Sequence, residues 1–387
     1  MRRQIEGPVR VMRIIARMNV GGPAVQVSGL IRGFSSLEFD QRLYTGFCTL
    51  HEADYLDLVA TDVNAIRIDG LGRRVNFRGD VRAFLFLIKA IREFKPHIIH
   101  THTAKAGVLG RIASLVSMHK SIRVHTYHGH LLKGYFGPLK SLLVVITEKL
   151  LALITQQLLA VGEKVRQDLL EAGVGKRGRF EIMPPGLEIG VLPLRHESQE
   201  FFGLKKGYLE CAFIGRITQI KRPDRFLDVV SEINKRDIKL HFFMSGDGDQ
   251  MDKCRERIIS ENLPVVILGW QSDIEKVLSA ADIVLLTSDN EGTPLSLIQA
   301  GMAGLPVVTT NVGSIPEVVL SGVTGIITEL DVQQIADALE NLTNNPGLRA
   351  QLGNAAQEFT LANFGVQRLV RDHEELYKQL LSNRAKF

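Results

Sequence analysis

Cysteine is scarce in this sequence: only Cys48, Cys211 and Cys254 occur among 387 residues. Their number is odd, and no two of them are close enough along the chain to form a metal-binding pair. These features argue against a disulfide framework and against a structural zinc site. They suit a reducing compartment, so we expect a cytoplasmic protein.

Long apolar runs are also lacking. No extended apolar segment of the signal-peptide kind stands at the N-terminus. The most apolar stretch, from Leu142 to Val161, is interrupted by five polar residues: Thr147, Glu148, Lys149, Gln156 and Gln157. Such a stretch is too polar for a membrane span, and we predict a buried helix there.

A third missing pattern is the dinucleotide fingerprint, in which three glycines follow the first strand and an acidic residue stands about 20 positions later. Only Gly21 and Gly22 follow the first apolar run, which covers Val9 to Ala16. A nicotinamide-dependent dehydrogenase is thereby excluded.

Charge is unevenly distributed along the chain. Residues 1–180 carry 27 Lys and Arg against 14 Asp and Glu, whereas residues 181–387 carry 20 against 28. The net charge of +5 therefore hides a basic half and an acidic half. A basic half suits an anionic partner such as a phosphorylated lipid, a membrane surface or nucleic acid, unless it is simply a solvated surface. Of these partners we favour an anionic membrane surface, approached peripherally from the cytoplasm, and expect no nucleic acid.

Short apolar runs alternate with amphipathic stretches of helix length, which is typical of parallel sheets with crossover helices. The chain is also longer than one hydrophobic core usually supports. We predict strands at Val9–Ala16, His97–Thr101, Val124–Tyr127, Cys211–Ile214, Leu240–Met244, Val265–Leu268, Ile283–Leu286 and Val307–Thr309. A turn cluster at Met183–Gly186 interrupts the alternation. We therefore predict an α/β fold of two Rossmann-like domains, covering residues 1–185 and 186–360 and followed by a helical segment over 361–387.

The segment after the strand Cys211–Ile214 has the character of a diphosphate site. Gly215 and Arg216 follow that strand, Lys221 comes five residues later, and Pro223 opens the next helix. A guanidinium can bridge two phosphate oxygens while a lysine acts as a point charge, and both would lie beside a helix N-terminus. The alternative is that both cations are merely solvated.

A second signal follows the strand Ile283–Leu286. We predict that Thr293 caps a helix and that Pro294 occupies its first turn, while Gly292 admits a ligand to the free backbone N–H groups. Glu291 would repel an anion at this position, so we assign it to sugar hydroxyls. The alternative for Glu291 is a simple capping acid.

Glycine loops occur at other predicted strand ends: Gly21–Gly22, Gly246–Gly248 and Gly269–Trp270. Glycine at a strand end admits a close ligand or a tight turn. Asp247 and Asp249 form an acid pair that could hold a divalent metal. No third ligand stands nearby, and Arg216 and Lys221 can balance a diphosphate without one, so we expect no metal site.

Histidines gather in the first half, at His100, His102, His125, His128 and His130. His128 follows the predicted strand Val124–Tyr127, and we predict that it contacts a sugar or phosphate oxygen. The alternative for each of the five is a structural histidine bonded to the backbone.

These motifs occur in a fixed order, and Gly313 with Pro316–Glu317 follows them. Gly215–Arg216 with Lys221, Gly246–Gly248, Glu291–Leu295 and Ala303–Val308, joined by Gly21–Gly22 and His128–Gly129, resemble the retaining glycosyltransferases of family 4. The resemblance spans nearly the whole chain.

The resemblance implies the GT-B architecture, in which two Rossmann-like domains face each other and the last helix crosses back onto the first. Residues 1–185 would bind the acceptor, 186–360 would bind the nucleotide sugar, and 361–387 would form the crossing helix. It also implies metal-independent transfer, with retention, from a nucleoside diphosphate sugar, for which we expect a UDP-linked donor. No cofactor beyond this donor is expected. The acceptor would be lipid-linked or a polysaccharide, in cell-surface glycan synthesis.

Roles for individual residues follow from the same resemblance. The diphosphate would contact Arg216 and Lys221 beside Gly215. The sugar and its phosphate would contact Glu291 and the backbone of Gly292, Thr293, Pro294 and Leu295. From the first domain, Gly21 and Gly22 would approach the donor and His128 would contact the transferring sugar. Trp270 would flank the base, beside the loop that contains Gly246 and Gly248.

One position departs from the family pattern. A second Glu usually follows the first by eight positions and binds the ribose, but this chain has Gln299 there. An amide can still accept from one hydroxyl and donate to the other. Alternatives are a changed donor preference or a non-catalytic protein that binds nucleotide sugar. A nucleotide-sugar epimerase of the same architecture also stays open.

Overall fold

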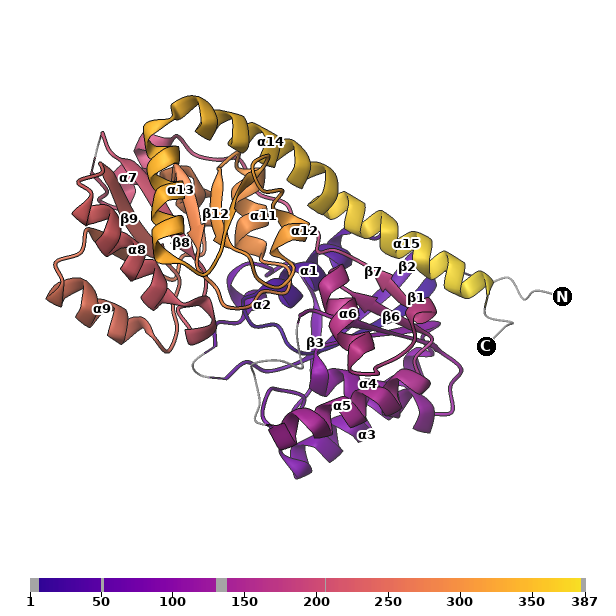
Figure 1. The fold of residues 1–387 in the computed structure, drawn as a ribbon. Helices are drawn as coiled ribbons and strands as arrows, with labels where there is room; N and C mark the ends of the chain where they lie inside the picture. Colours follow the sequence, from indigo (N-terminus) through magenta and orange to yellow (C-terminus); the bar gives the residue numbers. More distant parts are fainter. Residues whose placement is uncertain (1–6, 50–51, 130–137, 206, 384–387) are drawn as a thin grey trace. The chain divides into compact units, whose positions relative to one another are not determined.

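The computed structural model describes residues 7–49, 52–129, 138–205 and 207–383, and the chain divides into two compact units. Unit 1 comprises Met1–Leu187 together with Val366–Phe387, and unit 2 comprises Glu188–Gly365. The boundaries predicted from the sequence fall after residues 185 and 360. Each unit contains one parallel sheet between helices, as predicted (Figure 1).

Unit 1 contains a seven-stranded sheet in the order β3-β2-β1-β4-β5-β6-β7. Its strands are β1 Val9–Arg17, β2 Phe39–Gly46, β3 Ala65–Arg67, β4 Ile98–His102, β5 Ile122–Tyr127, β6 Gln157–Ala160 and β7 Phe180–Ile182. Its helices are α1 Gly22–Gly33, α2 Tyr55–Leu58, α3 Phe77–Phe94, α4 Ala104–Val116, α5 Pro138–Leu153, α6 Glu163–Glu171 and α15 Val366–Ser382, with a 3₁₀ turn at Arg177–Arg179. The inner strand β1 is buried over most of its length, as expected of a parallel strand covered on both faces.

Unit 2 contains a six-stranded parallel sheet in the order β10-β9-β8-β11-β12-β13. Its strands are β8 Leu209–Ile214, β9 Leu240–Ser245, β10 Val265–Gly269, β11 Ile283–Leu286, β12 Val307–Thr310 and β13 Gly325–Thr328. Its helices are α7 Arg195–Phe201, α8 Pro223–Lys235, α9 Met251–Ser260, α10 Ile274–Ala280, α11 Leu295–Met302, α12 Ile315–Val318, α13 Val332–Asn344 and α14 Pro346–Phe364, with the 3₁₀ turn η2 at Gln219–Lys221.

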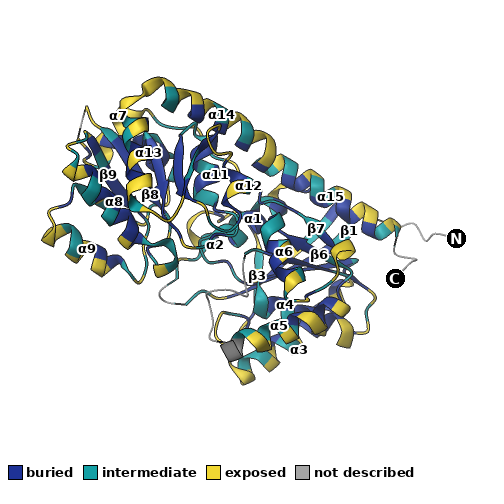
Figure 2. Ribbon diagram, in the orientation of Figure 1, coloured by how far each residue is buried: buried dark blue, intermediate teal, exposed yellow. Residues whose placement is uncertain are grey.

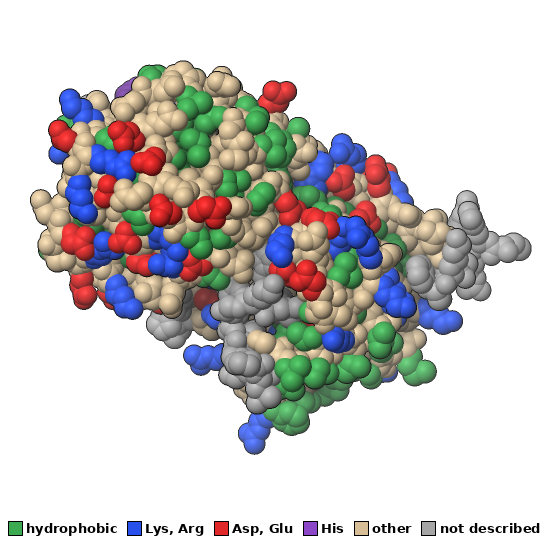
Figure 3. Space-filling view, viewed as in Figure 1, with side chains coloured by type: hydrophobic (Ala, Val, Ile, Leu, Met, Phe, Trp, Pro, Cys, Tyr) green, Lys and Arg blue, Asp and Glu red, His purple; other side chains and the backbone are tan. Residues whose placement is uncertain are grey.

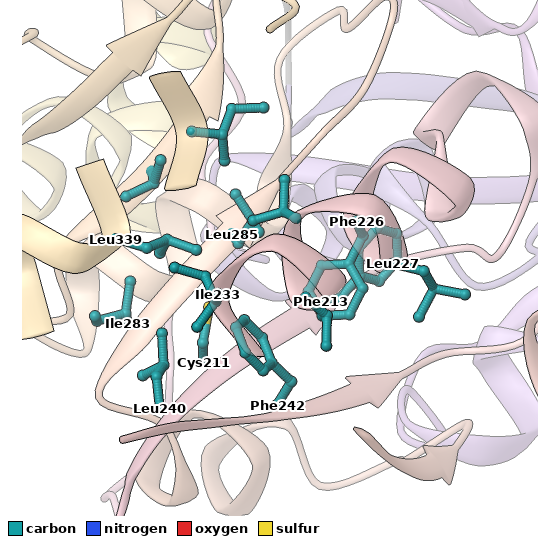
Figure 4. Close-up of a cluster of buried hydrophobic side chains, with 14 of the residues drawn as sticks. Cys211, Phe213, Phe226, Leu227, Ile233, Leu240, Phe242, Ile283, Leu285 and Leu339 are labelled. Atoms are coloured by element: carbon teal, nitrogen blue, oxygen red, sulfur yellow. The ribbon is translucent and has the colours of Figure 1, made fainter. Parts of the chain in front are cut away.

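The core of unit 2 forms where α8 and α13 cover one face of its sheet. Figure 4 shows Phe213 and Phe242 of the sheet beside Phe226 of α8, and Leu339 of α13 completes the cluster. The ring centroids of Phe213 and Phe226 are 5.3 Å apart, in an edge-to-face contact. This packing fixes the start of α8, and with it the 3₁₀ turn η2 that precedes it.

The last helix, α15, belongs to unit 1 although it follows unit 2 in sequence. Its apolar side chains Leu369 and Tyr377 join the core cluster that contains Val11 of β1 and Ile98 of β4. A Cβ atom at Gly33 of α1 would lie 2.2 Å from Val370, so glycine is needed for the close approach of α1 and α15. The burial of one face of α15 is visible in Figure 2.

The prediction of a buried helix from Leu142 to Val161 was wrong in two ways. Helix α5 ends at Leu153, and the strand β6 follows within the same stretch. Leu143 and Leu150 of α5 are 58% and 61% exposed, so one face of this helix is open to solvent. In the described part of the chain, no helix has both the length and the apolar composition needed to cross a membrane.

Candidate functional site

The predicted site residues of unit 2 lie in loops at one edge of its sheet. Because the strands are parallel, the segments that follow β8, β9, β11 and β12 all leave from their carboxyl ends. These segments are 215–222, 246–250, 287–294 and 311–314. Open α/β sheets bind their ligands at this edge.

The structure brings Lys221 and Glu291 into direct contact. The Nζ atom of Lys221 lies 2.5 Å from Oε1 of Glu291, and Oγ of Ser288 donates to the same oxygen at 2.5 Å. Glu291 is 7% exposed and Ser288 is fully buried. The sequence assigned these two side chains to different parts of a ligand, and it assigned no role to Ser288.

The backbone of Glu291 is held by the loop that follows β12. The N–H of Ser314 donates to the carbonyl oxygen of Glu291 at 3.1 Å. Gly313 has a φ of +54°, and a Cβ atom there would lie 1.9 Å from the same carbonyl oxygen. Thr310 adds a hydrogen bond of 2.7 Å to the carbonyl of Ser288. Gly313 is therefore required to position Glu291, a role that its place among the family motifs did not reveal.

The loop that follows β11 is also bonded to the segment that contains Lys221. Thr287 donates to the carbonyl oxygens of Lys221 and Arg222, at 3.2 and 2.9 Å. The buried Arg225 donates to the carbonyl of Thr287 and to Asp289, both at 2.7 Å. These bonds hold the backbone segments that carry the Lys221 and Glu291 side chains.

The predicted cap of α11 was wrong. The helix begins at Leu295, and Pro294, not Thr293, occupies the N-cap position. Pro294 has φ −71° and ψ 109°, an extended conformation that its ring favours, and its side chain has no oxygen to bond the first turn. The first N–H groups of a helix have no partner within the helix. In α11 they begin at Leu295, at the end of the loop that contains Glu291 and Gly292.

Arg216 differs from Lys221 in its surroundings. Its side chain is exposed and makes no hydrogen bond or ion pair with any residue that the structure describes. The preceding Gly215 has a φ of +153° and leaves open space where a Cβ atom would stand. A free guanidinium at the carboxyl edge of the sheet can bind an anion without first breaking an internal ion pair.

Gly246 and Gly248 have a structural explanation. A Cβ atom at Gly246 would lie 1.8 Å from the carbonyl oxygen of Gly215, and one at Gly248 would lie 2.3 Å from that of Ile217. The two loops therefore pack backbone against backbone, and glycine is required whether or not a ligand approaches. Asp247 accepts a hydrogen bond of 2.8 Å from the N–H of Gly248. Among the described residues, no three His, Cys, Asp or Glu side chains gather as a metal site would need.

Trp270 lies at the end of a strand and Gln299 lies within a helix, as the sequence predicted. Trp270 directly follows β10 and is 37% exposed. Gln299 is the fifth residue of α11 and is partly buried, and no other residue of the described structure bonds its side-chain amide.

In unit 1, the corresponding edge carries Gly21 and His128. Gly21 precedes α1, which begins at Gly22, and His128 follows β5. The Nε2 atom of His128 lies 2.9 Å from Nδ1 of His102, whereas no described residue bonds Nδ1 of His128, which could meet a ligand. Burial lowers the pKa of His128 to about 3, so its imidazole is neutral at physiological pH.

His100, His102 and His125 are almost completely buried, and the partners that they bond are side chains rather than the backbone carbonyls of the structural alternative. His125 lies 2.8 Å from the hydroxyl of Thr101. His100 lies 2.6 Å from the hydroxyl of Tyr377 in α15 and 2.7 Å from that of Thr126. Burial lowers the pKa of each histidine in this cluster. His130 lies outside the described residues.

The two sheets and their carboxyl-edge loops define the GT-B class of fold. Similar solved structures include the Anabaena protein Alr3699/HepE in complex with UDP-glucose, with a TM-score of 0.81 and 17% identity over 96% of this chain and all of that one. Another is the sucrose-phosphate synthase of Thermosynechococcus elongatus, with a TM-score of 0.81 and 17% identity over 97% of this chain and 99% of that one.

Two family models match nearly the whole chain: Glycosyltransferase Family 4 over residues 20–190 and Glycosyl transferases group 1 over residues 195–359. The chain belongs to these group 1, family 4 glycosyltransferases. One relative is the UDP-Gal:alpha-D-GlcNAc-diphosphoundecaprenol alpha-1,3-galactosyltransferase of Escherichia coli, 25% identical over 86% of this chain and 87% of its own. Another is the capsular polysaccharide biosynthesis glycosyltransferase CapM of Staphylococcus aureus, 22% identical over 85% of this chain and 89% of its own.

Proposed function

We propose that this glycosyltransferase moves a sugar, with retention, from a UDP-linked donor to a lipid-linked or polysaccharide acceptor in cell-surface glycan synthesis. The observation that carries the proposal is the carboxyl edge of the sheet in unit 2. There the exposed guanidinium of Arg216 accompanies the Lys221–Glu291 pair and the start of α11. An anion-binding group, a buried carboxylate and a helix N-terminus are what a sugar diphosphate requires.

Two kinds of relative support the choice of donor and acceptor. Alr3699/HepE was solved with UDP and with UDP-glucose. The Escherichia coli relative is named for a UDP-linked galactose donor and a diphosphoundecaprenol acceptor. We extend both to this chain and assign the diphosphate to Arg216 and Lys221, and the sugar to Glu291 and His128.

The Lys221–Glu291 pair suggests how the site would bind the donor. The carboxylate accepts bonds from Lys221 and Ser288 through Oε1, which hold it in place at the carboxyl edge of the sheet, where it would meet the hydroxyls of a sugar. Lys221 and Arg216 would stabilise the negative charge that grows on the departing diphosphate, so no metal is needed for this purpose. EDTA should therefore leave the activity intact.

The test is a thermal-shift panel of UDP, GDP and ADP and their sugars. A ligand at ~100 times its Kd adds ~2.7 kcal/mol of stability. We expect UDP and one UDP-sugar to stabilise the protein. Incubation of that donor without acceptor then separates transfer from epimerisation, because an epimerase would release an isomerised sugar or its elimination product. No stabilisation by any nucleotide would refute the proposal.

Gln299 favours one second candidate, a non-catalytic protein that binds nucleotide sugar and regulates a true transferase. Nucleotide binding without turnover on any lipid-linked or glycan acceptor would support it.

A further inference from the structure

The outer face of α3, α4 and α5 in unit 1 carries many exposed apolar side chains. Helix α4 contacts both of its neighbours, so the three helices form one continuous layer on the sheet. Figure 3 shows the apolar side chains gathered over these helices. They are Val81, Leu85 and Phe86 of α3, Ile112, Leu115 and Val116 of α4, Met118 just after it, and Leu142, Leu143, Ile146, Leu150 and Leu153 of α5.

Helix α5 is apolar on both of its faces. Leu151 and Ala152 are buried against the rest of unit 1, whereas Leu143, Ile146 and Leu150 recur at helical spacing on the solvent side. A helix on the surface of a soluble domain normally presents polar residues there. Large contiguous apolar surfaces mark a site of interaction.

The acidic groups of this layer are paired or turned inward. Helix α4 contains no Asp or Glu, and the only acid of α5 is Glu148. Glu148 is buried, where it accepts two hydrogen bonds from Arg111, at 2.9 and 2.8 Å, and one from Tyr127, at 2.8 Å. In α3, Asp80 pairs with Lys105 at 2.5 Å and Glu93 lies 3.8 Å from Lys89.

Exposed cations occur on α3 and α5 and just after α4. They are Arg78, Arg82, Lys89 and Arg92 of α3, Lys120 after α4 and Lys149 of α5. The layer therefore combines an apolar surface with positive charge, and this pairing suits a lipid surface with anionic headgroups.

We infer that the face formed by α3, α4 and α5 docks on an anionic lipid bilayer. The leucines of α5 enter the boundary of the acyl chains, and the exposed cations of the same layer contact the headgroups. A two-fold dimer through the same face would bring these cations against their own copies, because an isologous interface pairs a patch with itself. The inference rests on the proposed function, since the docked face would hold the enzyme at the membrane that contains a lipid-linked acceptor.

The test is flotation of the full chain with vesicles of phosphatidylcholine alone and of phosphatidylcholine mixed equally with phosphatidylglycerol. We expect binding to the mixed vesicles, weakened by salt, and little binding to the neutral ones. The double variant Leu143→Gln/Leu150→Gln should bind ~10-fold less, because the inserted apolar area is lost. Ile259→Gln/Leu361→Gln is the matched control, as both residues are exposed on helices of unit 2.

UDP-induced thermal stabilisation, measured on the same samples, shows that the α5 variant is folded and separates the two proposals. Stabilisation by UDP without vesicle binding would overturn the docking face alone. Vesicle binding without stabilisation by any nucleotide would overturn the proposed function and leave the face intact. Equal loss of binding in the control variant, or a dimer in sedimentation velocity that the α5 variant abolishes, would also overturn the docking face.

Discussion

The Nζ atom of Lys221 lies 2.5 Å from Oε1 of Glu291, although the two residues are 70 positions apart in sequence. Their side chains are only 13% and 8% exposed. Removal of one partner leaves the other charge in a poorly solvated place without its counter-ion, whereas removal of both leaves neutral groups. The pair therefore ties η2 to the loop after β11 and also presents two polar groups to a ligand.

Lys221→Met should lower the free energy of unfolding by about 2–3 kcal/mol, because it leaves the carboxylate of Glu291 without its counter-ion. Adding Glu291→Gln to this variant should cost less than the sum of the single changes, with a coupling of about 1–2 kcal/mol. Urea denaturation of the four proteins measures this coupling. Lys235→Met is the control, since its ion pair with Glu232 is long, at 3.8 Å, and exposed. Additive effects would show that the pair contributes no stability.

Arg216→Ala should separate activity from stability. The side chain is exposed and bonds no residue in the described parts of the chain, so its loss should change the free energy of unfolding by no more than about 0.5 kcal/mol. Turnover should fall on the order of 100-fold, because the guanidinium would stabilise charge on the departing diphosphate. Steady-state kinetics measures the turnover and urea denaturation measures the free energy of unfolding, both on one preparation. Unchanged turnover would remove Arg216 from the diphosphate site.

The strands that the sequence predicted were those with a continuous apolar run, such as Val9–Ala16 and Ile283–Leu286. The strands β2, β3, β7 and β13 were missed, and β6 lies in the stretch that was read as a helix. β3 and β7 have three residues each and β13 has four, whereas the longer β2 is interrupted by charged residues in its sequence FDQRLYTG. The helix α14 was also missed. Leu142–Val161 was misread because its apolar composition suggested burial, whereas composition alone does not say which faces of a helix are covered.

The candidate site was predicted better as a set of positions than as a set of contacts. Strand ends and glycines located Arg216 and Glu291 at one edge of a sheet, and the family resemblance pointed to Gln299 in the helix that follows. That Lys221 would meet Glu291 could not be inferred, because the contact depends on how the loops after β8 and β11 pack together. The bond from His102 to His128 likewise joins the ends of two strands that are neighbours only in the folded sheet.

His102 should act as a positioning residue for His128. Its Nδ1 atom lies 2.9 Å from Nε2 of His128 and fixes the orientation of that ring. His102→Leu should lower kcat about 10-fold, whereas His102→Asn, which keeps a polar atom near the position of Nδ1, should retain most of the activity. A purely structural role would predict equal losses of thermal stability and activity in both variants, so the two quantities are measured together.

Substitutions at Gln299 and at Glu291 should change different kinetic constants. Ribose does not change during transfer, so Gln299→Ala should raise KM with little change in kcat. Glu291→Gln should lower kcat, because the transferring sugar gains positive character that a carboxylate stabilises. Gln299→Glu should tighten UDP binding by roughly 1 kcal/mol. Calorimetry with UDP and steady-state kinetics check these values. A large loss of kcat in Gln299→Ala with unaltered UDP affinity would mean that the two roles are assigned wrongly.

Glu210, in β8, should make the stability of the protein depend on pH. Its carboxyl group is 1% exposed, and neither of its oxygens has a hydrogen-bond partner in the described structure. Burial, with a further contribution from Asp282, raises the pKa of Glu210 to about 7. Because this folded-state pKa lies above that of an unfolded glutamate, the folded protein binds more protons between about pH 4 and pH 7. The stability linked to this group is therefore present at low pH and is lost as the pH rises through 7.

Glu210→Gln removes this ionisation while it keeps the size of the side chain. The variant should match the original protein near pH 4 and exceed it at pH 8 by on the order of 2–3 kcal/mol in the free energy of unfolding. Urea denaturation across this range measures the difference. Glu256→Gln, at an exposed position of α9, is the control and should show no such trend. Activity should be unaffected, because Glu210 lies near the start of β8 and the candidate site lies beyond its carboxyl end. A difference that does not grow with pH would show that Glu210 is ionised in the folded protein throughout this range.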